Sequence, residues 1–194
     1  MSYIKFRPAF YLSIAVYLLL VPVSWLSGWL IAAMVHELFH IIALKLCGFS
    51  INGIIIGASG AQIKTNAYPG IKMILCAMAG PLSGFLLLIL LRCFPRVAIC
   101  GLVQSLGNLI PMYPLDGGRV FCSILNMFFT NRVSYRIYKS TEVAIVVVLI
   151  MIATYCTAKF NIGIMPVLMM GVFLMKKKYL ANNCFSEYNS VNRN

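Results

Sequence analysis

One long apolar stretch limits what this chain can fold into. No charged residue occurs between Pro8 and Val35, and the apolar character continues to Leu44. A transmembrane helix needs about 20 mostly apolar residues, so this stretch suits two crossings joined by a tight turn, which we expect at residues 24–28. Over the whole chain 61% of residues are hydrophobic and 10% are charged, against about 25% charged residues in soluble domains. The sequence therefore predicts a polytopic membrane protein.

Further apolar runs bring the expected number of crossings to six. They cover residues 73–91, 97–115, 143–158 and 160–175, the last two extended by lysines whose charged ends can reach the membrane surface. The predicted fold is an all-α polytopic membrane protein with about six transmembrane helices. We expect one membrane domain at residues 1–175 and a short polar cytoplasmic tail at residues 176–194.

The distribution of positive charge predicts the orientation. With six crossings both termini lie on one side, and 13 of the 16 lysines and arginines fall in segments on that side. Cytoplasmic segments carry the excess of basic residues, so both termini are expected in the cytoplasm. The net charge is +12, and the lysines and arginines that produce it lie between the apolar runs. This distribution favours contact with the lipid bilayer over binding of nucleic acid. The basic run at 132–139 is expected at the inner headgroups, with substrate contact as the alternative.

Both histidines of the chain lie in one short motif, His36-Glu37-Leu-Phe-His40. Residues four apart stack on one face of a helix, so His36 and His40 can present two nitrogens to one metal ion. Glu37 can then take a proton from a water on that ion. Catalytic zinc keeps three protein ligands and one open position. The motif therefore predicts a zinc site, with one Zn²⁺ per chain, that needs a third ligand.

Three carboxylates remain as candidates for the third ligand. Glu187 lies in the polar tail, and Glu142 has Lys139 three residues before it, which favours a helix-end ion pair over metal ligation. Asp116 is expected to end the fourth span, between prolines and glycines that interrupt a regular helix. Spans two and four cross in the same direction, so Asp116 and the histidine motif reach a similar depth on the cytoplasmic side. Asp116 is the preferred ligand.

The two motifs together resemble the site-2 protease family of intramembrane zinc metalloproteases. The resemblance rests on the histidine motif in the second span and on the run Asn108-Leu-Ile-Pro-Met-Tyr-Pro114-Leu-Asp116-Gly-Gly in the fourth. It is nearest to the branch of the stage IV sporulation protein FB, and we expect no nucleotide-sensing CBS domain here. It implies His36, His40 and Asp116 as zinc ligands and Glu37 as the base. It further implies that Asn108 and Pro114 shape the substrate cleft, although an interhelical hydrogen bond is an equal alternative for Asn108.

Residues 49–70 suggest how a substrate could be held. The segments 51–56 and 61–65 flank a glycine-containing turn and predict a short membrane-associated β-hairpin after the second span. A helical substrate hides its peptide bonds, so an extended segment could add to the hairpin edge at Ile54, Ile55 and Ile56. An ordinary surface hairpin is an equal alternative.

The leading hypothesis is an intramembrane zinc endopeptidase that acts on a membrane-inserted protein substrate. The alternative is a non-catalytic zinc-binding membrane scaffold or transport protein. The presence of Glu37 favours the enzyme, because a pure binding site does not need a base. A pro-sigma or anti-sigma factor in bacterial sporulation, and a regulatory membrane protein as a further partner, are expected from the resemblance alone.

Overall fold

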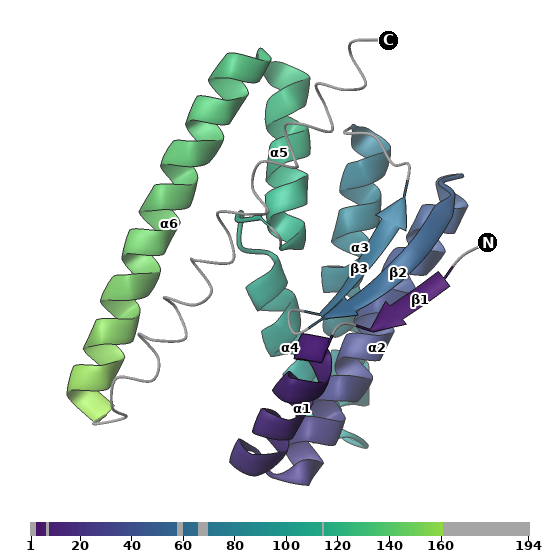
Figure 1. Cartoon of the computed structure of the whole chain (residues 1–194), viewed down its shortest axis with the longest axis vertical. Helices are drawn as coiled ribbons and strands as arrows, with labels where there is room; N and C mark the ends of the chain where they lie inside the picture. The colour runs from purple at the N-terminus through teal and green to yellow at the C-terminus, as the bar shows by residue number, and fades with distance from the viewer. Residues whose placement is uncertain (1–2, 7, 58–59, 66–69, 114, 161–194) are drawn as a thin grey trace. The chain divides into compact units, whose positions relative to one another are not determined.

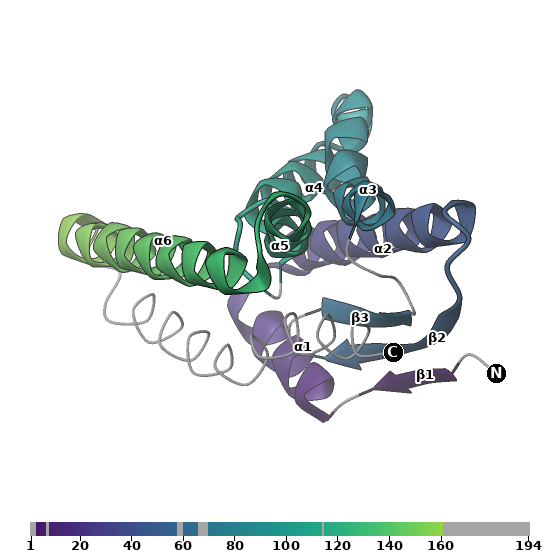
Figure 2. The same ribbon diagram turned by 90° about the horizontal axis from the view of Figure 1, so that it is seen from above.

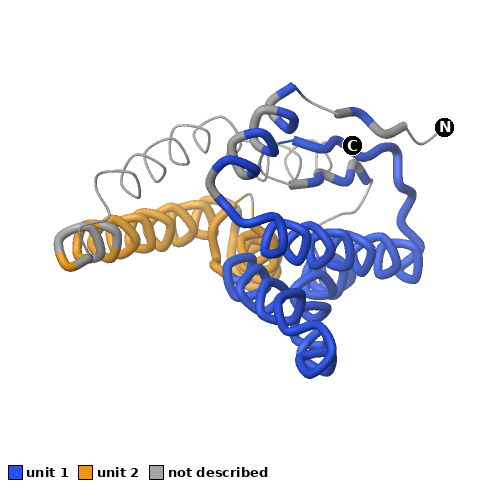
Figure 3. The backbone as a smooth tube through the Cα atoms, turned by 90° about the horizontal axis from the view of Figure 1, so that it is seen from below, with its two compact units in different colours: residues 1–109 blue, residues 110–194 orange. Residues whose placement is uncertain are grey.

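The computed structural model describes residues 3–6, 8–57, 60–65, 70–113 and 115–160 (Figure 1). It divides into two compact units, residues 1–109 and 110–194, which are taken separately (Figure 3). The predicted boundary between a membrane domain and a polar tail, and the predicted crossing beyond residue 160, lie outside the described residues. The described residues are mostly helical, as the sequence predicts.

A proline separates the first two helices of the chain. Helix α1 spans Pro8–Leu20 and helix α2 spans Val23–Leu46. Pro22 has no N–H to continue a helix, and its carbonyl accepts hydrogen bonds from the N–H groups of Trp25 and Leu26, at 2.9 and 3.1 Å. The turn predicted at residues 24–28 is therefore wrong in position, because these residues form the first turns of α2. Gly28 instead lets Arg96 come within 3.3 Å of the place where a Cβ would stand.

Three helices of the first unit pack against one another. They are α2, α3 (Ile71–Leu87, continued by the 3₁₀ turn η1, Leu88–Leu90) and α4 (Pro95–Asn108). In Figure 2, α3 and α4 lie on one side of α2 and the β-strands on the other. Helices α3 and α4 meet at two glycines, because a Cβ on Gly84 would come within 2.8 Å of the Gly101 carbonyl carbon. Such small-residue contacts are typical of helices packed in membranes.

Burial along α2 is the reverse of the pattern in a soluble helix. Met34 is 73% exposed and Leu38 is 52% exposed, whereas His36 and His40 are buried. Among the described residues two helices are long and apolar enough to cross a membrane, Val23–Leu46 and Ile71–Leu90. Only 22% and 39% of their most apolar segments are buried, so most side chains of these two segments face outward. The count of six crossings stays a prediction.

The described strands of the first unit form one three-stranded sheet. Strand β2 (Ile51–Gly57) pairs with β3 (Gly60–Thr65) in antiparallel fashion, as the sequence predicts. Strand β1 (Tyr3–Phe6) was not predicted, and it pairs in parallel with the other edge of β2, so that the order is β1-β2-β3. β2 is therefore the central strand. Association of the sheet with a membrane stays a prediction.

The second unit contains α5 (Asp116–Phe128) and α6 (Asn131–Phe160), joined by two residues. Buried Ser134 stabilises the connection between α5 and α6, because its hydroxyl donates to the carbonyls of Leu125 at 3.0 Å and Phe129 at 3.3 Å. These carbonyls lie at the end of α5, where helical partners are lacking. The hydroxyl of Ser134 therefore takes the place of a helical partner at the end of α5.

Two predictions for this region are corrected. The crossing expected at residues 97–115 is not one helix, because α4 ends at Asn108 and a segment containing Pro111 follows. Asp116 consequently begins α5 and does not end the fourth helix. In addition, α6 starts twelve residues before the expected crossing at 143–158, so the basic run at 132–139 is helical.

The joint between α5 and α6 can be tested with two serines of α6. Replacement Ser134→Ala leaves two α5 carbonyls without their hydroxyl donor and should lower the free energy of unfolding by about 1–2 kcal/mol. Ser140→Ala, at an exposed position of the same helix, is the matched control and should change it by less than about 0.5 kcal/mol. Denaturant unfolding in detergent micelles, followed by circular dichroism, measures both. Equal stability of the two variants would contradict the proposed role of Ser134.

Candidate metal centre

The buried face of α2 is a line of residues four apart. Helical geometry places such residues on one side of the helix, and here they change from small to imidazole-bearing side chains. The line consists of Gly28, Ala32, His36, His40 and Leu44. The small residues let neighbouring helices come close, so that the two imidazoles are enclosed. The four-residue spacing predicted from the sequence is thus the spacing of the buried face.

The two imidazoles point their Nε2 atoms at each other, 3.2 Å apart, with the rings edge to face at 83°. The Nδ1 of His40 donates to the carbonyl of Cys76 on α3 at 2.8 Å, which leaves the His40 Nε2 without a proton in the neutral ring. The amide Nδ2 of Asn108 on α4 donates to the His36 Nε2 at 3.2 Å, so that atom is also an acceptor. Two acceptor lone pairs therefore face one another.

This arrangement fits a metal ion. Two nitrogens bound to tetrahedral zinc at 2.0–2.1 Å stand about 3.3 Å apart, close to the 3.2 Å between the two Nε2 atoms. Ligating histidines usually donate their other ring N–H to a carbonyl or carboxylate, which fixes the ring orientation. His40 does so through Cys76. The first unit therefore carries two imidazole nitrogens at a spacing that suits zinc ligation.

Gly80 on α3 makes room for both rings. A Cβ built there would stand 2.6 Å from the Cε1 of His40 and 2.7 Å from the Cε1 of His36, too close for any side chain. The next residue, Pro81, is also buried, and the hydroxyl of Ser83 donates to the Gly80 carbonyl at 2.6 Å. Gly80 thus sets how closely α3 can approach the imidazole pair.

The structure places the other predicted residues of α2 and α4 as follows. Glu37 is half-buried next to His36, about 100° around the helix from it. Asn108 forms the interhelical hydrogen bond that was one of its two predicted roles, and its partner is His36 itself. Contact between Asn108 and a substrate stays a prediction.

Asp116 belongs to the second unit, where it is the first residue of α5 and 8% exposed. A carboxylate at a helix N-terminus is favoured by the helix dipole. The turn before it is closed by a hydrogen bond from the Leu115 N–H to the Met112 carbonyl at 2.9 Å. A buried carboxylate is chemically suited to ligate a metal ion, and ligation by Asp116 stays a prediction.

Glu142 forms the ion pair that the sequence favoured for it. Its carboxylate accepts a hydrogen bond from the Lys139 ammonium at 2.8 Å, and Glu142 is buried whereas the lysine is half exposed. This hydrogen bond raises the pKa of Lys139 above its usual value. The pair accounts for the burial of Glu142 without a metal ion.

The other residues predicted to contact the substrate are Pro114 and Ile54, Ile55 and Ile56 of β2. Pro114 lies outside the described residues. The main chains of Ile54, Ile55 and Ile56 pair with β1 on one side and with β3 on the other, so they offer no unpaired edge to a further strand. Ile55 is buried, and Ile54 and Ile56 on the opposite face are half-buried.

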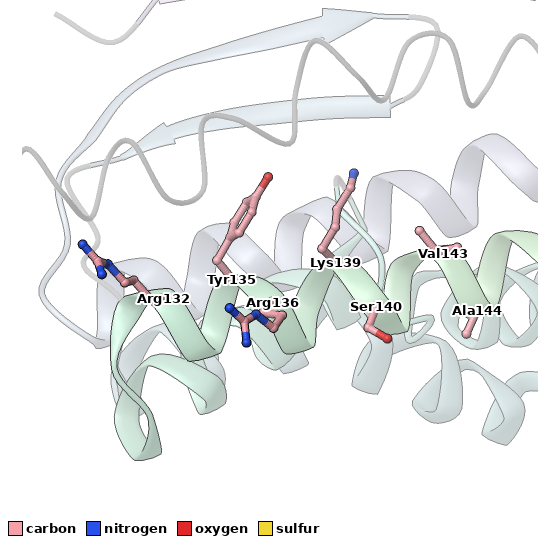
Figure 4. Close-up of a pocket in the computed structure, with 7 residues that line it drawn as sticks. All are labelled: Arg132, Tyr135, Arg136, Lys139, Ser140, Val143 and Ala144. Carbon is pink, nitrogen blue, oxygen red and sulfur yellow. The ribbon is translucent and has the colours of Figure 1, made fainter.

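An open hollow of about 810 Å³ lies along one side of α6 (Figure 4). It is lined by Arg132, Tyr135, Arg136, Lys139, Ser140, Val143 and Ala144. None of these described lining residues is a candidate zinc ligand. The change from basic to apolar residues along this side agrees with the predicted position at the headgroups, and contact with lipid or with substrate stays a prediction.

Sequence reasoning missed the residues that position the ligands. Gly80 belongs to a run rich in small residues, Gly80-Pro81-Leu-Ser83-Gly84. Such a composition could have indicated a close contact between helices. The carbonyl of Cys76 left no signal, because any residue type supplies a main-chain oxygen.

Comparison with known proteins finds a related sequence and a related fold. No protein-family model matches the chain. A zinc metalloprotease of Methanocaldococcus jannaschii is 29% identical over 128 residues, covering 59% of this chain and 36% of that protein. The match thus spans little more than a third of the relative. The site-2 protease structure from the same organism superposes with a TM-score of 0.66 at 20% identity, over 97% of this chain and 92% of that one. The fold is therefore that of a site-2 protease.

The fit of Gly80 to the imidazole pair predicts the effect of one methyl group. Gly80→Ala should displace at least one of the two rings and weaken zinc binding by at least about 10-fold. Gly107→Ala is the matched control, because no atom lies within 4 Å of a Cβ at that helical glycine. Competition with a chromogenic chelator measures both affinities. Unchanged zinc affinity in Gly80→Ala would show that the rings can move aside without cost.

Proposed function

We propose that this chain is a zinc-dependent intramembrane endopeptidase of the site-2 protease family. It would hydrolyse a peptide bond in or near a transmembrane segment of a membrane-bound protein. The observation that carries the proposal is the pair of facing Nε2 atoms, 3.2 Å apart, buried on a helix that is apolar outside and long enough to cross a membrane. The site-2 protease fold and the related zinc metalloprotease support it.

The proposed ligands are His36, His40 and Asp116. Each of them offers one ligand atom, and all three side chains are buried. Two histidines and a carboxylate are a ligand set of zinc peptidases, which leave the fourth position open. Bound zinc would supply a Lewis acid for the scissile carbonyl and lower the pKa of a bound water.

Glu37 is proposed as the general base and acid. Its carboxylate accepts the proton of the attacking water and returns it to the amine nitrogen that leaves. Its position next to His36 on α2 keeps it beside the ligands without using it as one. A glutamate is of no use to a site that only stores zinc, so Glu37 is the residue that separates an enzyme from a zinc-binding scaffold.

Asn108 is proposed to hold the substrate main chain. In the described structure its amide donates to the His36 Nε2. Once that lone pair serves a cation, the amide N–H needs another acceptor, and a substrate carbonyl can provide one.

The substrate is proposed to bind in an extended conformation along the sheet of the first unit. Main-chain pairing is available at the outer edge of β3, which among the described strands pairs only with β2. Ile54 and Ile56 would contribute through their half-buried side chains and not through their main chains. Both termini are proposed to lie in the cytoplasm, from the distribution of basic residues. The sporulation setting rests on the family resemblance alone.

The central test replaces the proposed base. Glu37→Gln keeps the size of the side chain and removes its proton acceptor, so cleavage should fall at least about 100-fold while zinc content stays at one ion per chain. Zinc is measured by atomic absorption, and cleavage is measured in proteoliposomes that contain single-span membrane proteins. Cleavage by Glu37→Gln at the parental rate would refute the mechanism. A parent that binds zinc and cleaves none of these proteins would favour the scaffold.

The ligand assignment is tested with two buried carboxylates. Asp116→Ala removes a proposed ligand and should leave only weak, substoichiometric zinc binding by the two histidines. Glu142→Gln is the control, because the partner of that carboxylate is Lys139, and zinc content should be retained. Loss of zinc in Glu142→Gln but not in Asp116→Ala would reverse the assignment.

A further inference from the structure

We propose that Tyr138 of α6 is a positioning residue for the metal centre, because its phenol oxygen holds the turn that presents Asp116. This inference rests on the proposed function, in which Asp116 ligates zinc. All the contacts that carry it lie within the second unit.

Tyr138 is joined to the segment before α5 by one short hydrogen bond. The main-chain N–H of Tyr113 donates to the Tyr138 phenol oxygen at 2.7 Å, across 25 residues of sequence. Tyr138 is 3% exposed, and its ring packs with Cys122 and Leu125 of α5. The ring of Phe121 lies 6.1 Å away, centroid to centroid. The phenol oxygen is therefore held in one place by the packing of its own ring.

The same peptide is pressed against α5 from the other side. A Cβ on Gly118 would stand 2.5 Å from both the Met112 carbonyl carbon and the Tyr113 nitrogen, so the peptide fits only because position 118 is glycine. The Met112–Tyr113 peptide thus touches the first turn of α5 and also bonds to α6. Its position is determined by contacts to both helices.

Movement of this peptide would be passed on to Asp116. The Met112 carbonyl accepts from the Leu115 N–H at 2.9 Å, and the Leu115 carbonyl accepts from the Gly118 N–H at 3.1 Å. Asp116 lies between these two hydrogen bonds. Ligand groups must be held within about 0.5 Å of their productive geometry, so a small shift of Tyr113 is enough to weaken metal binding.

A second contact, four residues before Tyr138, also holds α6 against α5. Ser134, one helical turn before Tyr138, donates to two carbonyls at the end of α5. Residues four apart lie on one face of a helix, so Ser134 and Tyr138 present the same side of α6 to α5. Figure 1 shows the two helices leaving their joint in the same general direction and diverging with distance from it. α6 thereby acts as a support for the turn before Asp116.

The test uses the full chain in detergent and removes one oxygen atom. Tyr138→Phe keeps the packed ring and should weaken zinc binding about 10-fold, as is usual for residues that orient a ligand. Tyr135→Phe, an exposed tyrosine of the same helix, is the matched control and should bind zinc like the parent. Zinc affinity is measured by chelator competition, and the visible spectrum of the Co²⁺-loaded protein reports the coordination geometry.

A double variant separates positioning from a general loss of stability. If Tyr138 acts through Asp116, Tyr138→Phe should cause no further loss of the residual zinc affinity in an Asp116→Ala background. An additional loss there, or parental zinc affinity and Co²⁺ spectrum in Tyr138→Phe alone, overturns the inference. If the parent binds no zinc, the proposed function fails first. A parent that binds zinc while Tyr138→Phe is indistinguishable from it leaves the proposed function standing without this inference.

Discussion

The proposed metal centre depends on the close approach of two helices at a residue without a side chain. Gly80 of α3 stands against the rings of His36 and His40, where even a methyl group would collide with both. That approach also brings the Cys76 carbonyl within 2.8 Å of the His40 Nδ1 and so decides which nitrogen keeps its proton. Ring position and ring tautomer thus follow from one packing contact.

The same contact explains why polar groups can be buried in so apolar a chain. The surface of α2 that faces away from its neighbours carries Met34 and Leu38, and its inner face carries the imidazoles. In a membrane this arrangement places apolar groups against lipid and shields polar groups within protein, where partners offset the cost of burial. The two facing lone pairs form an arrangement that a bound cation would relieve directly.

The second unit solves a different problem, the presentation of a carboxylate at the start of a helix. A regular helix continued from residue 97 through residue 116 would have carried Asp116 as one more side chain along its length. The break after Asn108 instead lets Asp116 start α5, and contacts from Gly118 and Tyr138 hold the turn before it. The Met112–Tyr113 peptide in the non-helical segment before α5 is thus held by contacts with Gly118 and Tyr138.

The sequence by itself determined the local features of this protein. Helical periodicity is a property of the backbone, so His36 and His40 had to share a face wherever α2 formed, and the antiparallel strands at 51–65 follow from residues close in the chain. Only the tertiary structure decided which residues surround them. The partners of the imidazoles lie 36 and 72 residues away, and each residue of β1 pairs with a residue 50 positions later in the chain. The sequence holds no local pattern for the Cys76 carbonyl that accepts from His40, for the space that Gly80 leaves, or for the pairing of β1 with β2. These features take effect only after distant segments of the chain have packed together.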